Sequence, residues 1–277
     1  MINCNGNIQN SSNFEIENNR GFLFGDAIFE TIKVNGTKIL FLEEHYLRLM
    51  ASMRICRMEI PMNFTMEFME EEILKLIQLQ SNTISNRIRF SVFRNAEGFY
   101  HPTSNNVQFI ITCSELTSDT YVISSTTYEV ELFKDFYVSK HLLATLKTNN
   151  KMINVVASIF AKENNFQNCL LINEDKNVVE ATNGTIFMKM GNQIITPPIS
   201  DGCLNGIMRK QVIAIVAKME GIEMIEKSIS PFDLQKADEL FISNVITGIQ
   251  PITKYRKKEF TSEVAKEITG LLNALIN

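Results

Sequence analysis

The spacing of hydrophobic and polar residues changes several times along the chain, and the changes predict a mixture of strands and helices. Alternation over residues 29–34 predicts a strand, and a second strand is predicted over 38–42. Asn35 and Gly36 separate the two, and both residue types tolerate a positive φ, so this segment is typical of a β-hairpin. The same patterns predict helices over 43–53 and 66–79, and strands over 87–93 and 107–113.

The second half of the chain shows a similar mixture. Met152, Val155 and Ile159 recur at helical spacing within a predicted helix over 148–163. Strands are predicted over 169–172, 186–190, 193–196, 222–228 and 239–243, and helices from 207 to about 219 and over 263–276. Strands and helices do not alternate regularly, so the pattern favours an α/β chain of the α+β kind over a doubly wound sheet.

A stretch rich in serine and threonine divides the two halves. Residues 114–127 lack a strong apolar period, which indicates a linker. We therefore expect an N-terminal domain over 1–116, a linker over 117–127 and a C-terminal domain over 128–277. A length of 277 residues is sufficient for two small domains.

Composition and charge narrow the class of protein. Hydrophobic residues make up 45% and charged residues 21%, as in ordinary globular proteins, and the net charge of −4 gives no basic face for nucleic acid. No apolar stretch is long enough to cross a bilayer, and the polar N-terminus does not resemble a secretory signal. Five cysteines without a Cys-x-x-Cys pair predict reduced thiols, and three scattered histidines predict no metal site. We expect a cytoplasmic protein without membrane or nucleic-acid partners.

Several common catalytic motifs are absent from the sequence. There is no glycine-rich dinucleotide fingerprint and no phosphate-binding P-loop. There is also no H-E-x-x-H zinc motif and no G-x-S-x-G nucleophile elbow. The chemistry must therefore come from another set of residues.

Four segments carry a resemblance to a known family. They read RGFLFGDAIFET (20–31), EHYLRL (44–49), LKTNN (146–150) and VEATNG (179–184), the last continuing through TPP to GIMRK (206–210). Their order and spacing, from about Arg20 to Ile252, resemble the class IV aminotransferases, the fold-type IV enzymes that use pyridoxal 5'-phosphate (PLP). That family includes branched-chain and D-amino acid aminotransferases and 4-amino-4-deoxychorismate lyase. The resemblance implies a smaller N-terminal α/β domain and a larger C-terminal domain of mixed sheets with a pseudo-barrel.

Lys147 matches the lysine that binds PLP as a Schiff base in this family. Only the neutral amine attacks a carbonyl, so such a lysine requires desolvation or a nearby cation. Taken alone, Lys147 would be interpreted as a surface lysine. Lys151, one helical turn further on, is the rival candidate.

Two further charged residues match cofactor-binding positions. Glu180 matches the carboxylate that pairs with the pyridine nitrogen and thereby strengthens the cofactor as an electron sink. Arg48 matches the arginine that binds the phosphate, for which a guanidinium offers a rigid fork of donors. Without the resemblance, they would be interpreted as a solvated strand-end glutamate and an exposed helix arginine.

Neutral groups complete the predicted phosphate site. Ile207 and Met208 follow Gly206 at the start of a helix, where free backbone N–H groups favour an anion. By resemblance, Ser243 and Asn244 complete the phosphate site.

The substrate side is assigned by resemblance alone. Glu30 lies in the Phe-Glu-Thr form typical of the aminotransferases. Tyr100 and His101 lie in a loop between two predicted strands, next to Gly98. The family is homodimeric, and we expect this loop to reach the substrate of the partner subunit.

The reaction is less firmly determined than the cofactor. Met208, Thr185 and Met152 depart from common family residues, and 241–252 resembles the lyase. Residues 94–103 lack the additional arginine of the D-amino acid enzymes. We favour an aminotransferase that acts on an amino acid through a Lys147 aldimine. One alternative is the lyase, which eliminates pyruvate to give 4-aminobenzoate for folate synthesis; the other is a non-catalytic binding protein with this fold.

Overall fold

The computed structural model describes residues 1–12, 14–79 and 84–276. Residues 13, 80–83 and 277, which belong to the predicted domains, lie outside the described residues. The chain divides into two compact units. The N-terminal unit comprises residues 1–119 and 146–150, and the C-terminal unit comprises 120–145 and 151–277. The boundary at Asp119 falls in the serine- and threonine-rich stretch, whereas the division by sequence placed 146–150 in the C-terminal domain.

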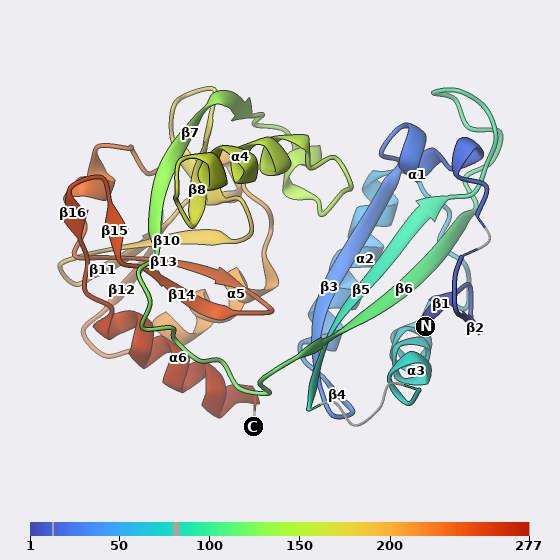
Figure 1. Cartoon of the computed structure of the whole chain (residues 1–277), viewed down its shortest axis with the longest axis horizontal. Coiled ribbons are helices and arrows are strands. Elements are labelled where there is room, and N and C mark those ends of the chain that lie inside the picture. Colours follow the sequence, from blue (N-terminus) through green and yellow to red (C-terminus); the bar gives the residue numbers. More distant parts are fainter. Residues whose placement is uncertain (13, 80–83, 277) are drawn as a thin grey trace. The chain divides into compact units, whose positions relative to one another are not determined.

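An antiparallel sheet forms the centre of the N-terminal unit (Figure 1). Its strand order is β2-β1-β6-β5-β3-β4. The long central strands are β3 (Ala27–Asn35), β5 (Ser85–Arg94) and β6 (Val107–Leu116), which contain the three strands predicted there. Ile28, Ile32 and Ile88 are all buried, which explains the strong apolar signal of these strands.

Hairpins close this sheet at both edges. The turn predicted at Gly36 is confirmed, because β3 pairs with β4 (Lys38–Ile39). The predicted strand over 38–42 was too long, since Phe41 adopts a positive φ and begins the next helix. At the other edge, β1 (Ile2–Cys4) pairs with β2 (Asn7–Gln9) around a turn with positive φ. This second hairpin was not predicted from the sequence.

Two helices pack on the apolar face of the sheet. They are α2 (Leu42–Ile55) and α3 (Met66–Ile77), both predicted to within a few residues. Leu49 and Met53 of α2 join Ile73 of α3 in one core with the sheet. This packing fixes the face of α2 that meets β3. The segment before β3 contains the short helices η1 (Ile16–Asn18) and α1 (Arg20–Leu23).

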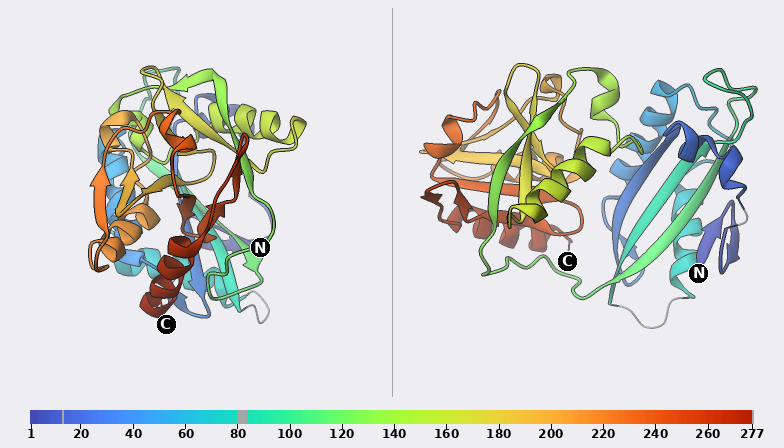
Figure 2. Two further views of the ribbon diagram at one scale, coloured as in Figure 1. Left: turned by 90° about the vertical axis from the view of Figure 1, so that its left-hand side faces the viewer. Right: turned by 45° about the horizontal axis from the view of Figure 1, so that its top comes forward.

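The described strands of the C-terminal unit form two mixed sheets (Figure 2). One has the order β12-β11-β10-β13-β14 and the other β16-β15-β7-β8-β9. Buried side chains of both, including Leu170 and Ile242, share one core. The strands are β7 (Glu129–Val138), β8 (Asn168–Asn173), β9 (Val178–Ala181), β10 (Thr185–Met190), β11 (Gln193–Thr196), β12 (Glu223–Glu226), β13 (Glu239–Asn244), β14 (Gly248–Ile252), β15 (Lys254–Tyr255) and β16 (Lys258–Glu259).

Helices cover the sheets of this unit. They are α4 (Met152–Glu163), α5 (Ile207–Val216) and α6 (Glu263–Ile276), with short 3-10 turns η2 (Leu142–Thr145), η3 (Ile199–Asp201) and η4 (Asp233–Gln235). The predicted helix over 148–163 was wrong at its start, because Thr148 forms a β-bridge with Ile28. The prediction for 263–276 is confirmed. Glu239 accepts hydrogen bonds from the N–H groups of Val264 and Ala265 and so anchors the start of α6.

These observations confirm a mixed α/β fold that is not a doubly wound sheet. All five cysteines are free. Within the described ranges, no helix has the length and hydrophobicity needed to span a bilayer, and no three metal-ligating side chains gather into a cation site.

Candidate active site

Backbone hydrogen bonds to β3 fix the segment that carries Lys147. The N–H of Phe29 donates to the carbonyl oxygen of Lys147 at 2.8 Å, and the N–H of Asn149 donates to Ala27 at 2.9 Å. Thr148 forms the bridge with Ile28. The segment that carries Lys147 is therefore held against a central strand, which explains why it belongs to the N-terminal unit.

A buried ionic cluster lies on the same strand. The Glu30 carboxylate on β3 accepts two hydrogen bonds from Arg48. Nε donates to Oε1 at 2.8 Å, and Nη2 donates to Oε2 at 2.5 Å. His45 Nδ1 lies 2.6 Å from Oε2 of the same carboxylate. His45 and Arg48 are three residues apart on α2 and therefore share a helical face. We refer to Glu30, His45 and Arg48 as the Glu30 cluster.

The charges in this cluster are set by burial and by mutual pairing. Burial alone would raise the pKa of Glu30, but Arg48 and His45 together lower it to about 2. Burial lowers the pKa of His45 below its usual value, against the opposite effect of Glu30, and the charges of Arg48 and Lys147 lower it further. Near pH 7 the cluster therefore contains a carboxylate, a guanidinium and a neutral imidazole.

Lys147 lies close enough to influence this cluster. Its charge is one of the causes of the lowered pKa of His45. The Lys147 amine lies 4.7 Å from the centre of the Phe29 ring, and the Arg89 guanidinium lies 3.5 Å from the same ring. Arg89 also donates to the side chain of Asn149 at 2.9 Å. The Phe29 ring and the Arg89 guanidinium thus lie against the lysine segment.

In the C-terminal unit, Glu180 lies on β9 and is half-buried. Its Oε2 accepts a hydrogen bond from the N–H of Leu204 at 3.0 Å. That turn leads directly to Gly206 and the start of α5. One backbone turn thus orients the carboxylate and begins the helix.

A set of neutral donors surrounds the start of α5. The helix has Gly206 as its N-cap, with no side chain bonded to its first N–H groups. A Cβ atom on Gly206 would lie 3.1 Å from Thr185 Oγ1, so the backbone approaches β10 closely. Ser243, which pairs with Thr185 across the sheet, is buried, and its Oγ has no hydrogen-bond partner among the described residues. Thr185, Gly206, Ile207, Met208 and Ser243 form what we call the Ser243 cradle.

The predicted loop residues are placed differently. Asn244 directs its Oδ1 to the N–H groups of Ile246 and Thr247, and thus stabilises a turn. Tyr100 and His101 are exposed in the N-terminal unit, outside the Glu30 cluster.

The predicted site residues fall into two groups. Lys147, Glu30 and Arg48 lie together in the N-terminal unit, and the C-terminal unit contains Glu180, Ile207, Met208 and Ser243. His45 was missed, although its spacing from Arg48 was visible in the sequence.

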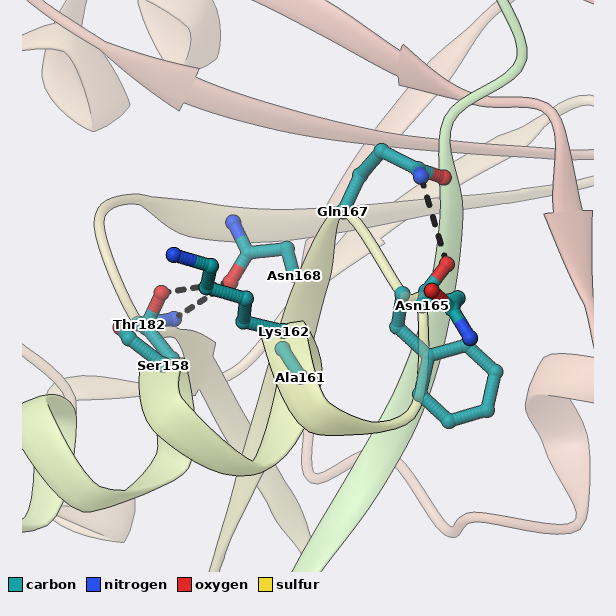
Figure 3. Close-up of a pocket in the computed structure, with 8 residues that line it drawn as sticks. Ser158, Ala161, Lys162, Asn165, Gln167, Asn168 and Thr182 are labelled. Carbon is teal, nitrogen blue, oxygen red and sulfur yellow. Dashed lines mark hydrogen bonds between the residues drawn. The ribbon is translucent and has the colours of Figure 1, made fainter.

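A polar hollow of about 390 Å³ lies at the end of α4 and contains none of the predicted site residues (Figure 3). Its most buried polar side chain, Asn168, is satisfied within the protein. It donates to Tyr128 Oη at 3.0 Å and to Asn183 Oδ1 at 2.8 Å, and it accepts from Thr182 Oγ1 at 2.5 Å. The hollow is lined by Ser158, Ala161, Lys162, Asn165, Phe166, Gln167, Asn168 and Thr182.

The family model for class IV amino-transferases matches residues 27–255, which include β3, Lys147, Glu180 and the cradle. The chain belongs to the class IV aminotransferase family. Members of this family are PLP-dependent enzymes, so the protein is an enzyme and PLP is its cofactor.

Curated relatives extend along nearly the whole chain. A putative branched-chain-amino-acid aminotransferase of Methanocaldococcus jannaschii is 28% identical over 91% of this chain and 86% of its own length. A D-alanine aminotransferase of Staphylococcus epidermidis is 27% identical over 90% of this chain and 87% of its own. The chain is thus similar to both kinds of aminotransferase.

Solved structures show the same fold. A branched-chain aminotransferase of Thermoproteus uzoniensis with norvaline superposes with a TM-score of 0.87 at 19% identity, covering 99% of this chain and 94% of the other. A putative 4-amino-4-deoxychorismate lyase of Legionella pneumophila gives 0.85 at 24% identity, covering 96% of each chain. The predicted fold type is confirmed by these matches.

The residues of the Ser243 cradle fit a phosphate group. A helix start without a side-chain cap offers N–H groups to an anion, and the absence of a side chain at Gly206 allows its backbone to lie close to Thr185. Among the described residues no group bonds to Ser243 Oγ, so it is a buried donor that needs an acceptor. Neutral donors of this kind can bind a phosphate dianion through hydrogen bonds, without a cationic side chain in the cradle.

Proposed function

We propose that this family member is an aminotransferase that acts on an amino acid, with Lys147 as the residue that holds PLP covalently. The observation that carries the proposal is the position of Lys147. Two backbone hydrogen bonds and a bridge hold its segment against β3, next to the Glu30 cluster and the face of Phe29. Lys151 begins the α4 helix in the other unit and has no such support.

Glu180, Arg48 and the Ser243 cradle would make the remaining contacts to the cofactor. Glu180, oriented by the N–H of Leu204, would face the pyridine nitrogen. Arg48 and the Ser243 cradle would bind the phosphate, and Glu30 would hold the guanidinium of Arg48 in a fixed plane. When bound, PLP supplies an electron sink for the carbanion at the substrate Cα.

Lys147 has a second task in this proposal. The amine released from the cofactor would take a proton from the substrate Cα and return one during the second half of the reaction. Confinement on β3 limits the positions that this amine can reach, which favours proton transfer on one face.

The 97–103 loop is proposed to contact the substrate. Tyr100 is 89% exposed and His101 is exposed, so both side chains are accessible to a ligand. We propose that the enzyme is a homodimer, in which each loop reaches the substrate bound by the partner. A monomer with full activity in sedimentation and kinetic experiments would contradict this part.

The reaction is tested by offering purified holoenzyme three substrate sets. These are branched-chain L-amino acids with 2-oxoglutarate, D-alanine with 2-oxoglutarate, and aminodeoxychorismate. We expect keto acid and glutamate from one of the first two sets. Formation of 4-aminobenzoate and pyruvate instead would contradict transamination and identify a lyase, and bound cofactor without any turnover would identify a binding protein.

Variants of the two lysines test the assignment of Lys147. Lys147→Ala should lower the turnover number by at least about 10²- to 10⁴-fold, the range for loss of a general base. Lys151→Ala is the matched control and should retain activity. Equal loss in both variants would leave the assignment without support.

A further inference from the structure

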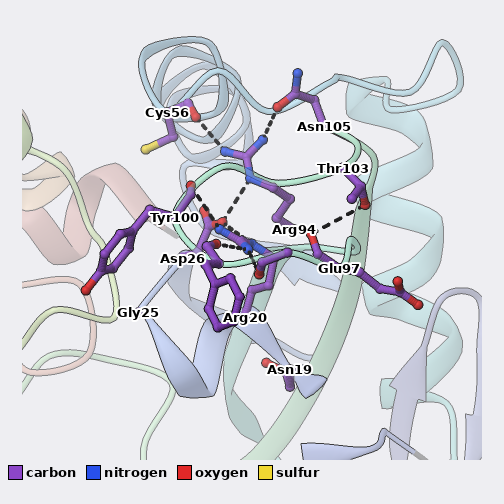
Figure 4. A network of polar contacts seen from close by, with 12 residues as sticks. Asn19, Arg20, Gly25, Asp26, Cys56, Arg94, Glu97, Tyr100, Thr103 and Asn105 are labelled. Carbon is purple, nitrogen blue, oxygen red and sulfur yellow. Dashed lines mark hydrogen bonds and ion pairs between the residues drawn. The ribbon is translucent and has the colours of Figure 1, made fainter. Parts of the chain in front are cut away.

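A second carboxylate cluster in the N-terminal unit connects the start of β3 to the 97–103 loop (Figure 4). Asp26 Oδ2 accepts a hydrogen bond from Arg20 Nε and another from Arg94 Nε, both at 2.9 Å. The Arg20 side chain is 4% exposed and that of Arg94 is 7% exposed. We refer to Arg20, Asp26 and Arg94 as the Asp26 clamp.

The arginines of this clamp bond mainly to backbone. Arg20 Nη1 donates to the carbonyl oxygens of Gly98 at 2.8 Å and Phe99 at 2.5 Å, and Nη2 lies 3.5 Å from that of Tyr100. Two guanidinium groups share one carboxylate, and carbonyl dipoles compensate the remaining positive charge. The loop backbone is therefore held at three successive residues.

Arg94 fixes the base of the same loop. Its Nη1 donates to Asn105 Oδ1 at 2.5 Å and to the carbonyl oxygen of Arg57 at 3.1 Å, and its Nη2 donates to that of Cys56 at 2.8 Å. The N–H of Thr103 closes the loop by donating to the carbonyl oxygen of Glu97 at 3.0 Å. Both ends and the tip of the loop are thus tied to the body of the unit.

Gly98 allows the backbone to take this path. Its φ is +96°, and a Cβ atom there would lie 2.5 Å from the carbonyl oxygen of His101. The result is a rigid loop with two large side chains outside it. Phe99 is 85% exposed and Tyr100 is 89% exposed, and Figure 4 shows the Tyr100 ring pointing away from the guanidinium groups.

We infer that Arg20, Asp26 and Arg94 are positioning residues, which order the 97–103 loop so that Tyr100 and His101 meet the substrate in one geometry. This inference rests on the proposed function of that loop. An ordered loop loses little conformational entropy on binding, so the clamp lowers KM and has little effect on the chemical step. None of the three residues needs to touch the substrate for this effect.

The chain has no tryptophan, which provides a direct probe of loop order. Phe99→Trp places a single tryptophan on the loop, which can be excited selectively over the six tyrosines, without changing the backbone carbonyl that Arg20 bonds. Its time-resolved anisotropy is compared alone and together with Arg20→Lys, Gly98→Ala or the control Arg54→Lys. Arg54 is an exposed residue of α2 outside the clamp. We expect fast local motion to increase with Arg20→Lys and Gly98→Ala only.

The same proteins are then used for steady-state kinetics and borohydride fixation of PLP. With Arg20→Lys and Gly98→Ala, KM should rise about tenfold while kcat changes less than about twofold. Unchanged anisotropy, or increased motion with unchanged KM, would overturn the inference. Absence of fixed PLP in the unmodified protein would instead overturn the proposed function, and the anisotropy would still show whether the clamp orders the loop.

Discussion

The Glu30 cluster and the Ser243 cradle differ in the charge of their side chains and in how their polar groups are stabilised. The first concentrates charge beside Lys147, with a carboxylate of 1% exposure between a guanidinium and an imidazole. The second contains no charged side chain and offers a hydroxyl and uncapped N–H groups. A buried charge must be paired within the protein. A neutral donor can stay without an acceptor until the ligand binds, because this costs less free energy of folding. Mutations should therefore destabilise the fold in the first region and weaken cofactor binding in the second.

The largest effect is expected for Glu30→Gln. Glutamine keeps the size of the side chain but leaves the buried Arg48 without its counter-ion, which costs about 3–5 kcal/mol of unfolding free energy. Urea denaturation of the apoprotein measures this loss. Glu43→Gln, on the exposed side of α2, is the matched control and should change the stability by less than about 0.5 kcal/mol. A stable Glu30→Gln protein would remove the contrast between the two regions.

The pH dependence of the free energy of unfolding tests the charge state of the same cluster. The pKa of Glu30 is about 2 in the folded chain, against an ordinary value of 4.5. Because the folded-state pKa is the lower one, the contribution is present above pH 4.5 and is lost as the pH falls from 4.5 towards 2. The loss amounts to about 3 kcal/mol at most. Glu30→Gln should show a flatter curve in that window, and parallel curves would argue against a lowered pKa.

The lowered pKa of His45 adds a contribution at higher pH. A histidine that stays neutral when folded contributes stability above its ordinary pKa of 6.5, and this is lost as the pH falls below that value. The stability should thus begin to decline below pH 6.5, before the Glu30 window is reached. His45→Asn should remove this first decline only.

A smaller effect is expected for Glu180→Gln, which tests the charge in the C-terminal unit. A hydrogen bond to a charged group is worth about 1.5–3 kcal/mol, so its loss should lower kcat about 10- to 100-fold. The amide still accepts from Leu204, so the apoprotein should keep its stability. A kcat within twofold of the native value would show that Glu180 does not face the pyridine nitrogen.

The smallest effect is expected for Ser243→Ala. One neutral hydrogen bond to phosphate is worth about 1 kcal/mol, or about a fivefold increase in the Kd for PLP. The free energy of unfolding of the apoprotein should be unchanged or slightly higher, since the mutation removes a buried hydroxyl that has no hydrogen-bond partner in the described part of the chain. Ser158→Ala on α4 should change neither quantity. A large loss of stability on replacing Ser243 would show that its role is structural.

Helices and strands were predicted well from the sequence where the hydrophobic residues follow a single helical or strand spacing. The 193–196 strand and the 263–276 helix were predicted to the residue. The helix over 148–163 failed at its start, because Thr148 pairs with a strand more than a hundred residues away and the local apolar pattern does not show this. The β1–β2 hairpin was missed, although Asn5-Gly6 is the same turn-forming pair as Asn35-Gly36.

The candidate site shows the same limit. Resemblance supplied Lys147, Glu30 and Arg48 as separate residues, but only the fold shows that they lie together. His45 could have been found from its helical spacing to Arg48. The Asp26 clamp could not have been predicted, since it depends on backbone carbonyl groups that carry no sequence signal.

The most direct test of the account is the site of covalent attachment. Purified protein is incubated with PLP, reduced with borohydride and digested, and the labelled peptide is sequenced by mass spectrometry. We expect a single label, on Lys147. A label on Lys151 or on another lysine, or no label despite excess cofactor, would contradict it.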